Sequence, residues 1–256
     1  MYATASSGEL MNTFRQMGVP FPLHDAPIDP HDDGDYFGLG TCSVCEARNS
    51  HCFRLGVGSY LVIACSACGV ANGLNVYDAK AAQCRHCGKE VPFNSNVAGK
   101  REPKICYACL RAGKVALTKD TEFGMISFEQ AISGVTNGVP GLQQDQFESV
   151  VFDDEEDWRG AKVPTELLWE LMKTPGYGTW QGERWLFCCR HPMTFVGEWE
   201  RDQFDAHSPD GDGSQFCYSV LTHLPENAWD AIGDAVAAYV FQCKQCGRFR
   251  GHWDCD

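Results

Sequence analysis

The sequence predicts an α+β protein in which tandem zinc-ribbon or treble-clef-like units precede a small α+β domain with a further zinc knuckle. Three observations predict this class: four CxxC pairs before residue 110, a change of composition after it, and one more CxxC pair near the end. All seven tryptophans, for example, lie between Trp158 and Trp253. The expected boundaries are 1–40 for an N-terminal helix and extended arm, 41–115 for a double zinc-knuckle region, 116–160 for a connector with an acidic run, and 161–256 for the C-terminal α+β domain.

The four CxxC pairs predict two structural zinc sites. Nineteen residues separate the first pair from the second and eighteen the third from the fourth, which suits four-cysteine zinc sites. Two such knuckles complete a tetrahedral site with no open position for water or substrate. Sequential pairing is favoured because it closes only short loops, and a cross-braced arrangement of first with third and second with fourth is the alternative. The ligands are Cys42, Cys45, Cys65, Cys68, Cys84, Cys87, Cys106 and Cys109.

Local patterns predict the elements around these pairs. A short helix is expected from Ser7 to Met17, with Gly18 as its stop, and an extended arm from Phe21 to Gly40, where proline and aspartate are dense. Residues 51–64 have strand-forming residues around a Gly-Val-Gly turn, and residues 88–105 are a looser version of the same pattern. Each stretch is therefore expected to form a hairpin between two knuckles.

The C-terminal domain has a clearer helical signal. Pro164 begins a stretch, TELLWELMK, with leucines at helical spacing before the stop at Pro175 and Gly176. Short strands are expected between residues 185 and 196, a second helix over residues 227–238, and a strand AYVFQ that leads into the last knuckle. DGDG at 210–213 resembles part of a calcium loop but lacks its later ligands, and it is interpreted as a turn.

The last CxxC pair predicts a third zinc site, because Cys243 and Cys246 need two more ligands. Cys188 and Cys189 are the obvious suppliers, although two adjacent residues both turn inward only where the backbone bends. His191 or Cys255 is the alternative for one of the two. The remaining interpretation is that these thiols are small residues of the core.

Charge and composition bear on location and partners. The net charge is −13, which repels phosphate backbones and attracts basic proteins. The longest apolar run is too short to span a bilayer, no secretory signal is evident, and the odd cysteine count favours metal binding over disulfides, so a cytoplasmic protein is expected. One acidic run is either a solvated loop or a contact patch for a basic partner: Asp153, Asp154, Glu155, Glu156 and Asp157.

Catalytic signatures are missing from the sequence. It has no HExxH motif, no Walker loop and no glycine-rich dinucleotide fingerprint. Cys188 or Cys189 with His191 as base would need a geometry that proximity in sequence does not establish. The chain is therefore expected to have no enzymatic activity, and its metal ions to be structural.

Several motifs resemble the CbrC family of bacterial proteins. They are FPLHDAP near the start, ICYAC followed by LRAG, then VPTELLWELMKTPGYGTWQGERWLFCC and FVG, and finally YVFQCKQCG with a terminal DCD. Members of that family are generally shorter and carry one pair of CxxC knuckles where this chain has two. The family is linked to tolerance of nuclease colicins and looks like an immunity component of bacterial toxin systems.

The resemblance implies an immunity protein that binds a cognate toxin domain, a basic nuclease, in the cytoplasm. An acidic protein that is stabilised by structural zinc suits that role. The alternative is a zinc-ribbon adaptor for nucleic acid or a stress response, with Arg101, Lys104, Arg111 and Lys114 as its modest basic cluster. A metal-assisted hydrolase at the third site is a further alternative, which requires an open coordination position.

Overall fold

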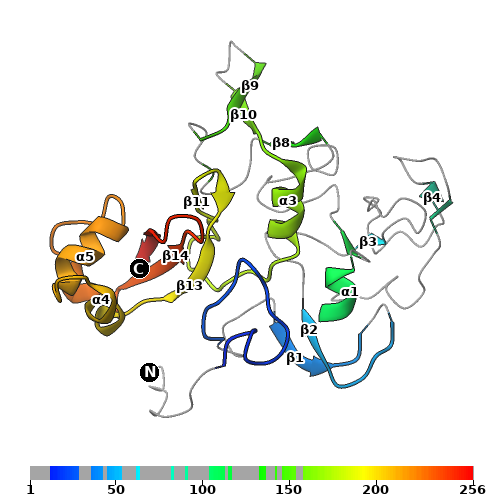
Figure 1. Ribbon diagram of the computed structural model, residues 1–256, viewed down its shortest axis with the longest axis horizontal. Helices are drawn as coiled ribbons and strands as arrows, with labels where there is room; N and C mark the ends of the chain where they lie inside the picture. Colours follow the sequence, from blue (N-terminus) through cyan, green and yellow to red (C-terminus); the bar gives the residue numbers. More distant parts are fainter. Residues whose placement is uncertain are drawn as a thin grey trace.

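The computed structural model is a mixed α/β structure with several small sheets (Figure 1). It describes residues 12–28, 36–42, 45–53, 62–63, 82–83, 90–91, 104–112, 115–116, 133–136, 142, 146–153 and 158–255. None of the described helices is long and apolar enough to cross a membrane.

The central sheet is antiparallel and has the order β13-β14-β15. Its strands are β13 (Thr194–Glu198), β14 (Val236–Gln242) and β15 (Phe249–Cys255). The strand β14 lies in the middle and is buried along nearly its whole length, as expected for its continuous apolar stretch VAAYVF. Gln242 lies opposite Phe249, so the six residues between them form the last knuckle.

The N-terminal arm covers the outer edge of β13. The amide of Asp25 donates to the carbonyl of Phe195, and the amide of Phe195 donates to the carbonyl of Leu23. The FPLHDAP stretch therefore continues the sheet in parallel direction for a short distance. This contact joins the first part of the chain to the C-terminal part.

The first unit consists of a small antiparallel sheet and a short helix. The sheet has the order β1-β2-β6, with β1 (Tyr36–Gly40), β2 (Ser50–Phe53) and β6 (Ile105–Cys106), and β6 leads directly into α1 (Tyr107–Arg111). Aromatic rings fill its core, and most of them meet edge to face. The core residues are Phe14, Val19, Phe21, Ile28, Tyr36, Cys42, Phe53, Ile105, Cys106, Cys109 and Leu110.

A helix lies between α1 and the central sheet, and a second small sheet lies above this helix in Figure 1. The helix α3 (Thr165–Met172) buries Leu168 and Leu171 against the central core. The sheet has the order β8-β10-β9, with β8 (Val135–Thr136), β9 (Glu148–Asp153) and β10 (Trp158–Lys162). The hairpin of β9 and β10 stands out from the rest of the molecule at the top of Figure 1.

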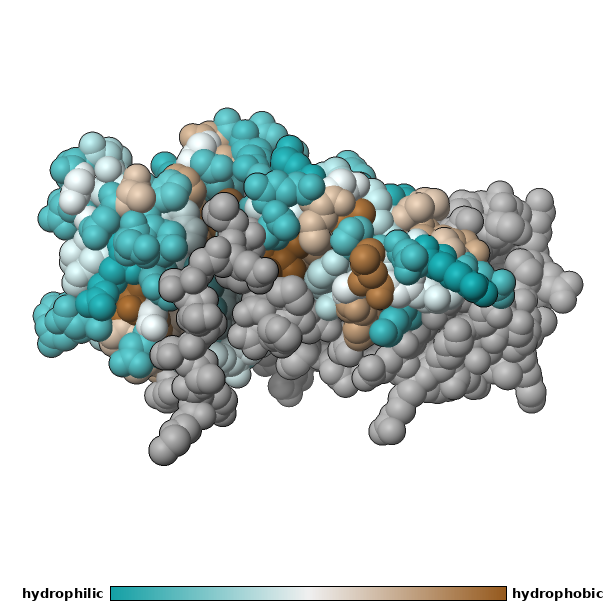
Figure 2. Space-filling view, turned by 90° about the horizontal axis from the view of Figure 1, so that it is seen from below, coloured by the Kyte–Doolittle hydropathy of each residue, from teal (hydrophilic) through white to brown (hydrophobic). Residues whose placement is uncertain are grey.

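The helices α4 (Arg201–His207) and α5 (Gly213–Val220) and the 3-10 helix η3 (Ala228–Ala231) form a lobe at the other side of the central sheet. Asp212 caps α5 by accepting a hydrogen bond from the Gln215 amide. A Cβ at Gly213 would collide with Asp205, so a glycine is required where the two helices meet. This end of the molecule has a mostly hydrophilic surface (Figure 2).

Shorter strands complete the described structure: β3 (Val62–Ile63) pairs with β7 (Val115–Ala116), β4 (Ala82–Gln83) pairs with β5 (Glu90–Val91), and β11 (Phe187–Cys188) pairs with β12 (His191–Pro192).

The structure confirms some of the predicted elements and corrects others. The helix after Pro164 and the strand before the last knuckle are present as α3 and β14. The second helix predicted over residues 227–238 is wrong, because η3 ends at Ala231 and β14 begins at Val236. The described part of the N-terminal helix, from Asn12, forms turns, and the arm ends in the strand β1.

Of the two hairpins predicted between knuckles, the one over residues 51–64 is wrong, because β2 pairs with β1 and β6 while β3 pairs with β7. Most of residues 88–105 lie outside the described residues, so the second hairpin stays a prediction. The mixed α and β content is confirmed, whereas the tandem arrangement is not, because β2 and β6 place Phe53 opposite Ile105. A zinc-ribbon or treble-clef fold for the first unit remains a prediction.

Candidate metal centres

The first centre brings together the first and the fourth CxxC pairs. The sulfur atoms of Cys42, Cys45, Cys106 and Cys109 all lie within 4.8 Å of one another. Three of these cysteines are buried, and Cys45 is exposed. Neither pairing expected from the sequence is found for Cys42 and Cys45, since both the sequential and the cross-braced arrangement give them other partners. Cys65, Cys68, Cys84 and Cys87 lie outside the described residues.

The sulfur separations in this centre fit a tetrahedral metal. Metal–sulfur bonds of about 2.3 Å in a tetrahedron place two sulfurs about 3.8 Å apart. The Sγ atoms of Cys45 and Cys106 are 3.7 Å apart. That separation is far longer than the bond of about 2.05 Å in a disulfide. The donor set is therefore suited to a thiophilic ion such as zinc.

The backbone presents the four thiols from two kinds of turn. In the turn of the first CxxC pair, the amide of Cys42 donates to the carbonyl of Ala47, and Glu46 takes a left-handed conformation with φ 61°. The second pair lies at the start of α1, where Cys106 is the N-cap. The Cys106 amide also donates to the Sγ of Cys42 at 3.3 Å. The free amides of a helix N-terminus and a hydrogen bond to sulfur both favour thiolates.

Without an ion, the surroundings oppose ionisation of the buried thiols. Burial, followed by hydrogen bonds to Cys45 and Cys106, raises the pKa of Cys109, and burial is also the main reason why the pKa of Cys106 is raised. Four thiolates cannot share such a small volume unless a cation compensates their charge. A bound divalent metal reverses this effect, because it takes the place of the protons.

The second centre confirms that the predicted C-terminal thiols meet. The sulfur atoms of Cys188, Cys189, Cys243 and Cys246 lie within 4.8 Å of one another. The Sγ of Cys188 is 3.7 Å from that of Cys246 and 3.9 Å from that of Cys189, again near the tetrahedral value. Cys188 and Cys243 are buried and the other two are exposed.

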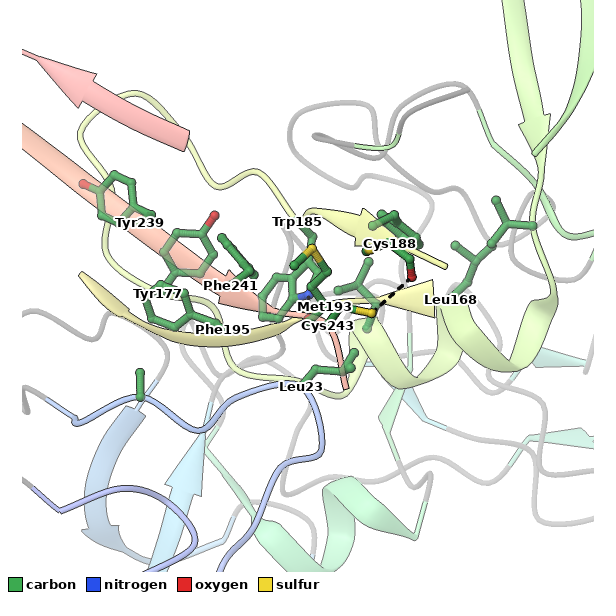
Figure 3. Packing of buried hydrophobic residues seen from close by; sticks show 14 of the residues in the cluster. Leu23, Leu168, Tyr177, Trp185, Cys188, Met193, Phe195, Tyr239, Phe241 and Cys243 are labelled. Atoms are coloured by element: carbon green, nitrogen blue, oxygen red, sulfur yellow. Dashed lines mark hydrogen bonds between the residues drawn. The ribbon is translucent and has the colours of Figure 1, made fainter. Parts of the chain in front are cut away.

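This centre lies at one end of the central core. Figure 3 shows Cys188 and Cys243 beside Met193 and Leu168, with the thiol of Cys243 directed to the carbonyl of Cys188 at 3.8 Å. Burial, followed by hydrogen bonding to the neighbouring thiols, raises the pKa of Cys188 to about 12. The thiol of Cys246 differs, because the amide of Arg248 donates to it and lowers its pKa to about 7.

Two adjacent cysteines reach this centre because the backbone turns sharply between them and their partner strand. Cys188 pairs with His191 in the hairpin of β11 and β12, so Cys189 and Arg190 are the two residues of the turn. Both have positive φ, 53° for Cys189 and 62° for Arg190, as a type I′ turn requires. Such turns favour Asn-Gly, and a Cys-Arg turn indicates that ligand placement outweighs local preference.

The alternative ligands considered for this centre are not part of it. The Nδ1 of His191 lies 3.0 Å from the carbonyl of Cys189, so this imidazole binds backbone and not a thiol. Cys255 pairs with Val236 at the far end of β15, about 20 Å along the strand from the knuckle at its start. The arrangement of Cys188, Cys189 and His191 therefore lacks the thiol–imidazole contact that a nucleophilic cysteine needs.

The two described residues of the predicted basic cluster, Lys104 and Arg111, have partners within the protein. Arg111 donates two hydrogen bonds to Glu170, at 2.6 and 3.0 Å, and the Nζ of Lys104 lies 5.0 Å from the ring centroid of Phe37. Arg101 and Lys114 lie outside the described residues. Of the acidic run, Asp153 ends β9 and pairs with Trp158 in β10, and the acids at 154–157 lie outside the described residues.

One buried polar group was missed by the sequence analysis. The hydroxyl of Tyr177 contacts the Nε2 of His252 at 2.8 Å, and the buried carboxylate of Asp254 accepts from the amides of Trp180 and Gln181. These contacts hold the TPGYGTWQGERW stretch against β15. The alternation of His252 and Asp254 within a strand was the available signal, because alternate residues share one face of a sheet.

The profile of a family described as "Uncharacterised protein family (UPF0167)" matches residues 64–255. The UPF0167 protein PA1536 of Pseudomonas aeruginosa is 31% identical over 112 residues, which make up 41% of this chain and 60% of that relative. The chain thus spans about 60% of the length of this relative. No solved structure matches the chain significantly. The family match contains the whole second centre and begins after Cys42 and Cys45.

Proposed function

The chain belongs to the uncharacterised protein family UPF0167, and we propose that it is a metal-stabilised immunity protein that binds and neutralises a basic toxin domain. Its metal ions are zinc and have a structural role, since each centre offers four thiols and no position for a substrate. The resemblance of its motifs to the CbrC family supports toxin immunity. The partner is a protein, and inhibition comes from covering the active site or nucleic-acid channel of the toxin.

The observation that carries this proposal is the concentration of acidic side chains on one lobe. Residues 198–234, around α4 and α5, contain nine acidic residues and a single arginine, more than half of the net charge of the chain. All nine are exposed. A surface of one sign raises the association rate with a partner of opposite sign, and carboxylates can occupy the places of phosphates. The nine acids are Glu198, Glu200, Asp202, Asp205, Asp210, Asp212, Glu226, Asp230 and Asp234.

Growth rescue tests this function. The cognate toxin domain, sought first in the gene adjacent to that of this chain, should arrest growth when it is expressed alone, and co-expression of the chain should restore growth. A purified complex of the two proteins should then form, with an association rate that falls as the salt concentration rises. Failure of the two proteins to associate at low salt would contradict the proposal.

A charge-neutralised variant tests the acidic lobe itself. Glu226, Asp230 and Asp234 lie outside the helix caps, so their conversion to Gln, Asn and Asn should leave the fold intact. The association rate should fall by about tenfold while the metal content stays unchanged. Conversion of exposed Gln215 to Asn is the matched control, because it alters the same lobe without a change of charge.

A further inference from the structure

The strand β9 is the open edge of the projecting hairpin. In the sheet order β8-β10-β9 it is the last strand, and within the described ranges no strand pairs with its outer side. It runs for six residues, Glu148–Asp153, and pairs regularly with β10 from Glu148 to Val151, after which a bulge at Phe152 interrupts the register. Such an edge offers a row of amide and carbonyl groups to any extended chain.

Two of the longer sheet edges in the described structure are covered. The edge of β13 is covered by the arm that contains Leu23 and Asp25. The edge of β15 is bridged by Leu221 at Gly251, and β1 has a bulge between Tyr36 and Leu39. The remaining edge strands apart from β9 span only two residues each. β9 also has a bulge, at Phe152, but its four regular residues, Glu148 to Val151, form the longest regular edge left open among the described strands.

The side chains of β9 add an apolar surface to this edge. Val151 is 45% exposed and Phe152 is 42% exposed, and they are two of the four large apolar side chains most exposed in the described structure. Phe152 is the extra residue of the bulge, where the regular alternation of faces is interrupted, so Val151 and Phe152 together place apolar surface at this end of the edge. A Cβ at Gly160 would collide with the ring of Phe152, so this glycine lets the ring lie across β10.

The charge at both ends of β9 indicates which kind of chain could bind along its open edge. Glu148 is at one end, Asp153 is at the other, and the acidic run continues to Asp157. The Nζ of Lys162 is 3.9 Å from Glu148, a distance that gives little neutralisation at an exposed pair. A second copy of this chain is a poor occupant, because antiparallel pairing would place Glu148 of one copy opposite Asp153 of the other. A basic segment meets attraction at both ends instead.

We propose that β9 is the docking strand for an extended segment of a protein partner in which lysine or arginine alternates with apolar residues. The segment adds to the β8-β10-β9 sheet at its open edge. Backbone hydrogen bonds supply much of the affinity, and alternate side chains contact Val151, Phe152 and Glu148. This inference goes beyond the proposed function and does not depend on it, because the charge at the ends of β9 by itself favours a basic segment.

A synthetic peptide tests the docking strand directly. The probe is a short blocked peptide in which lysine and valine alternate, and the control is the same peptide with alternate backbone nitrogens methylated. The full metal-loaded chain should bind the first peptide and lose at least about tenfold in affinity for the second, because methylation removes the donors while the charge stays the same. Equal affinity for the two peptides would show charge attraction alone and overturn the proposal.

Variants of the chain locate the binding. Val151→Lys places a positive charge on the edge and should weaken peptide binding by about tenfold, whereas Val151→Thr keeps a β-branched side chain and should bind almost normally. Both should keep the wild-type metal content and melting temperature. Unchanged binding by Val151→Lys would refute the assignment, as would a wild-type dimer that this substitution converts to monomer.

The test of the docking strand can fail or succeed independently of the test of the proposed function. If the toxin domain binds the chain with equal affinity in wild type and Val151→Lys, the docking strand is refuted and the immunity function stands. If the peptide binds at β9 while no toxin domain binds, the immunity function is refuted and the docking strand stands.

Discussion

Two histidines are buried in surroundings that keep them neutral. Burial lowers the pKa of His24 to about 3 and that of His252 to about 4. The ring of His24 lies between Phe14 and Phe195, and neither of its nitrogens has a hydrogen-bond partner in the described structure. The Tyr177 hydroxyl has a single proton, which it donates to the Arg184 carbonyl at 2.6 Å, so the Nε2 of His252 carries a proton and donates.

The neutral state of His24 predicts a loss of stability in acid. An unfolded histidine titrates near 6.5, whereas folded His24 titrates near 3, so between these values the unfolded chain binds one more proton. The free energy of unfolding should therefore be highest above about pH 6.5 and decrease as the pH falls. From about pH 6 to 5, His24 should account for roughly 1 kcal/mol of this decrease.

The variant His24→Leu should lack this share of the decrease. Urea unfolding at the two pH values should show a decrease smaller by roughly 1 kcal/mol than in wild type. His223→Asn is the control, because His223 is exposed and its φ of 59° is also tolerated by Asn. An identical pH dependence for His24→Leu and wild type would show that His24 is protonated in the folded protein.

The turn of the second centre gives another prediction at this scale. Arg190 is exposed and has a φ of 62°, which costs about 1–2 kcal/mol for a residue with a Cβ. Glycine avoids that cost but loses more entropy on folding, so Arg190→Gly should raise the free energy of unfolding by about 0.5–1 kcal/mol. Arg190→Ala retains a Cβ and should leave stability nearly unchanged. Urea unfolding of the metal-loaded proteins measures both, and equal effects of the two substitutions would refute strain at this position.

Among the elements, those with a strong local signal were predictable from sequence. The helix α3 has a proline at its start and leucines at helical spacing, and β14 is a continuous apolar strand. Residues 227–238 have features of both a helix and a strand. Pairing with β15 stabilises the strand from Val236 onward. The lobe of α4 and α5 was missed, since its helices are short and depend on caps at Glu200 and Asp212.

The ion pair between α1 and α3 joins the first centre to the central core. Arg111 follows Cys109 in α1, and its guanidinium bonds both carboxylate oxygens of Glu170 in α3. Hydrogen bonding by Glu170 raises the pKa of Arg111. Because both side chains are less than a third exposed, at 29% and 27%, the pair is shielded from solvent more than a surface pair.

Loss of this pair should destabilise the protein as a whole. Glu170→Gln keeps the shape of the side chain but removes its charge, and it should lower the free energy of unfolding by about 1–2 kcal/mol. Glu166→Gln in the first turn of the same helix is the control, because Glu166 is exposed. Urea unfolding of the two variants measures the difference, and equal stability of the two would show that the pair contributes nothing.

On the scale of the whole molecule, the sequence predicted the cysteine sets better than their connections. The C-terminal set of four was predictable because one CxxC pair near the end needed two further ligands. The CxxC pair that completes the centre of Cys42 and Cys45 was not predictable. The entropic cost of loop closure grows slowly with loop length, so it discriminates weakly between near and distant CxxC pairs. The pairing of β2 with β6 brings the fourth CxxC pair, which begins at Cys106, to the first.

Metal stoichiometry in double variants tests these connections. Cys42→Ser with Cys106→Ser should remove one zinc ion per chain, because both ligands belong to one centre. Cys42→Ser with Cys188→Ser should remove two, because the ligands belong to different centres. Elemental analysis of the purified proteins measures both. Loss of two ions from the first variant would show that Cys42 and Cys106 belong to different sites, as in the sequential or the cross-braced pairing of CxxC motifs.

The two CxxC pairs outside the described residues, which begin at Cys65 and Cys84, set the total number of zinc ions expected per chain. Fifteen residues separate Cys68 from Cys84, a spacing suited to a four-cysteine zinc site of their own. The wild-type chain should therefore bind three zinc ions, and Cys65→Ser with Cys84→Ser should bind two.

The register of β2 and β6 implies that the chain could be shortened. Phe53 and Ile105 face each other across two antiparallel strands, so residues 54–104 begin and end at adjacent positions. An Asn-Gly dipeptide is the natural link between antiparallel strands at such a point. Excision of residues 54–104 and ligation through that dipeptide would keep Cys42, Cys45, Cys106 and Cys109 in one centre. The product would be a miniature of this protein with two zinc ions and the acidic lobe intact.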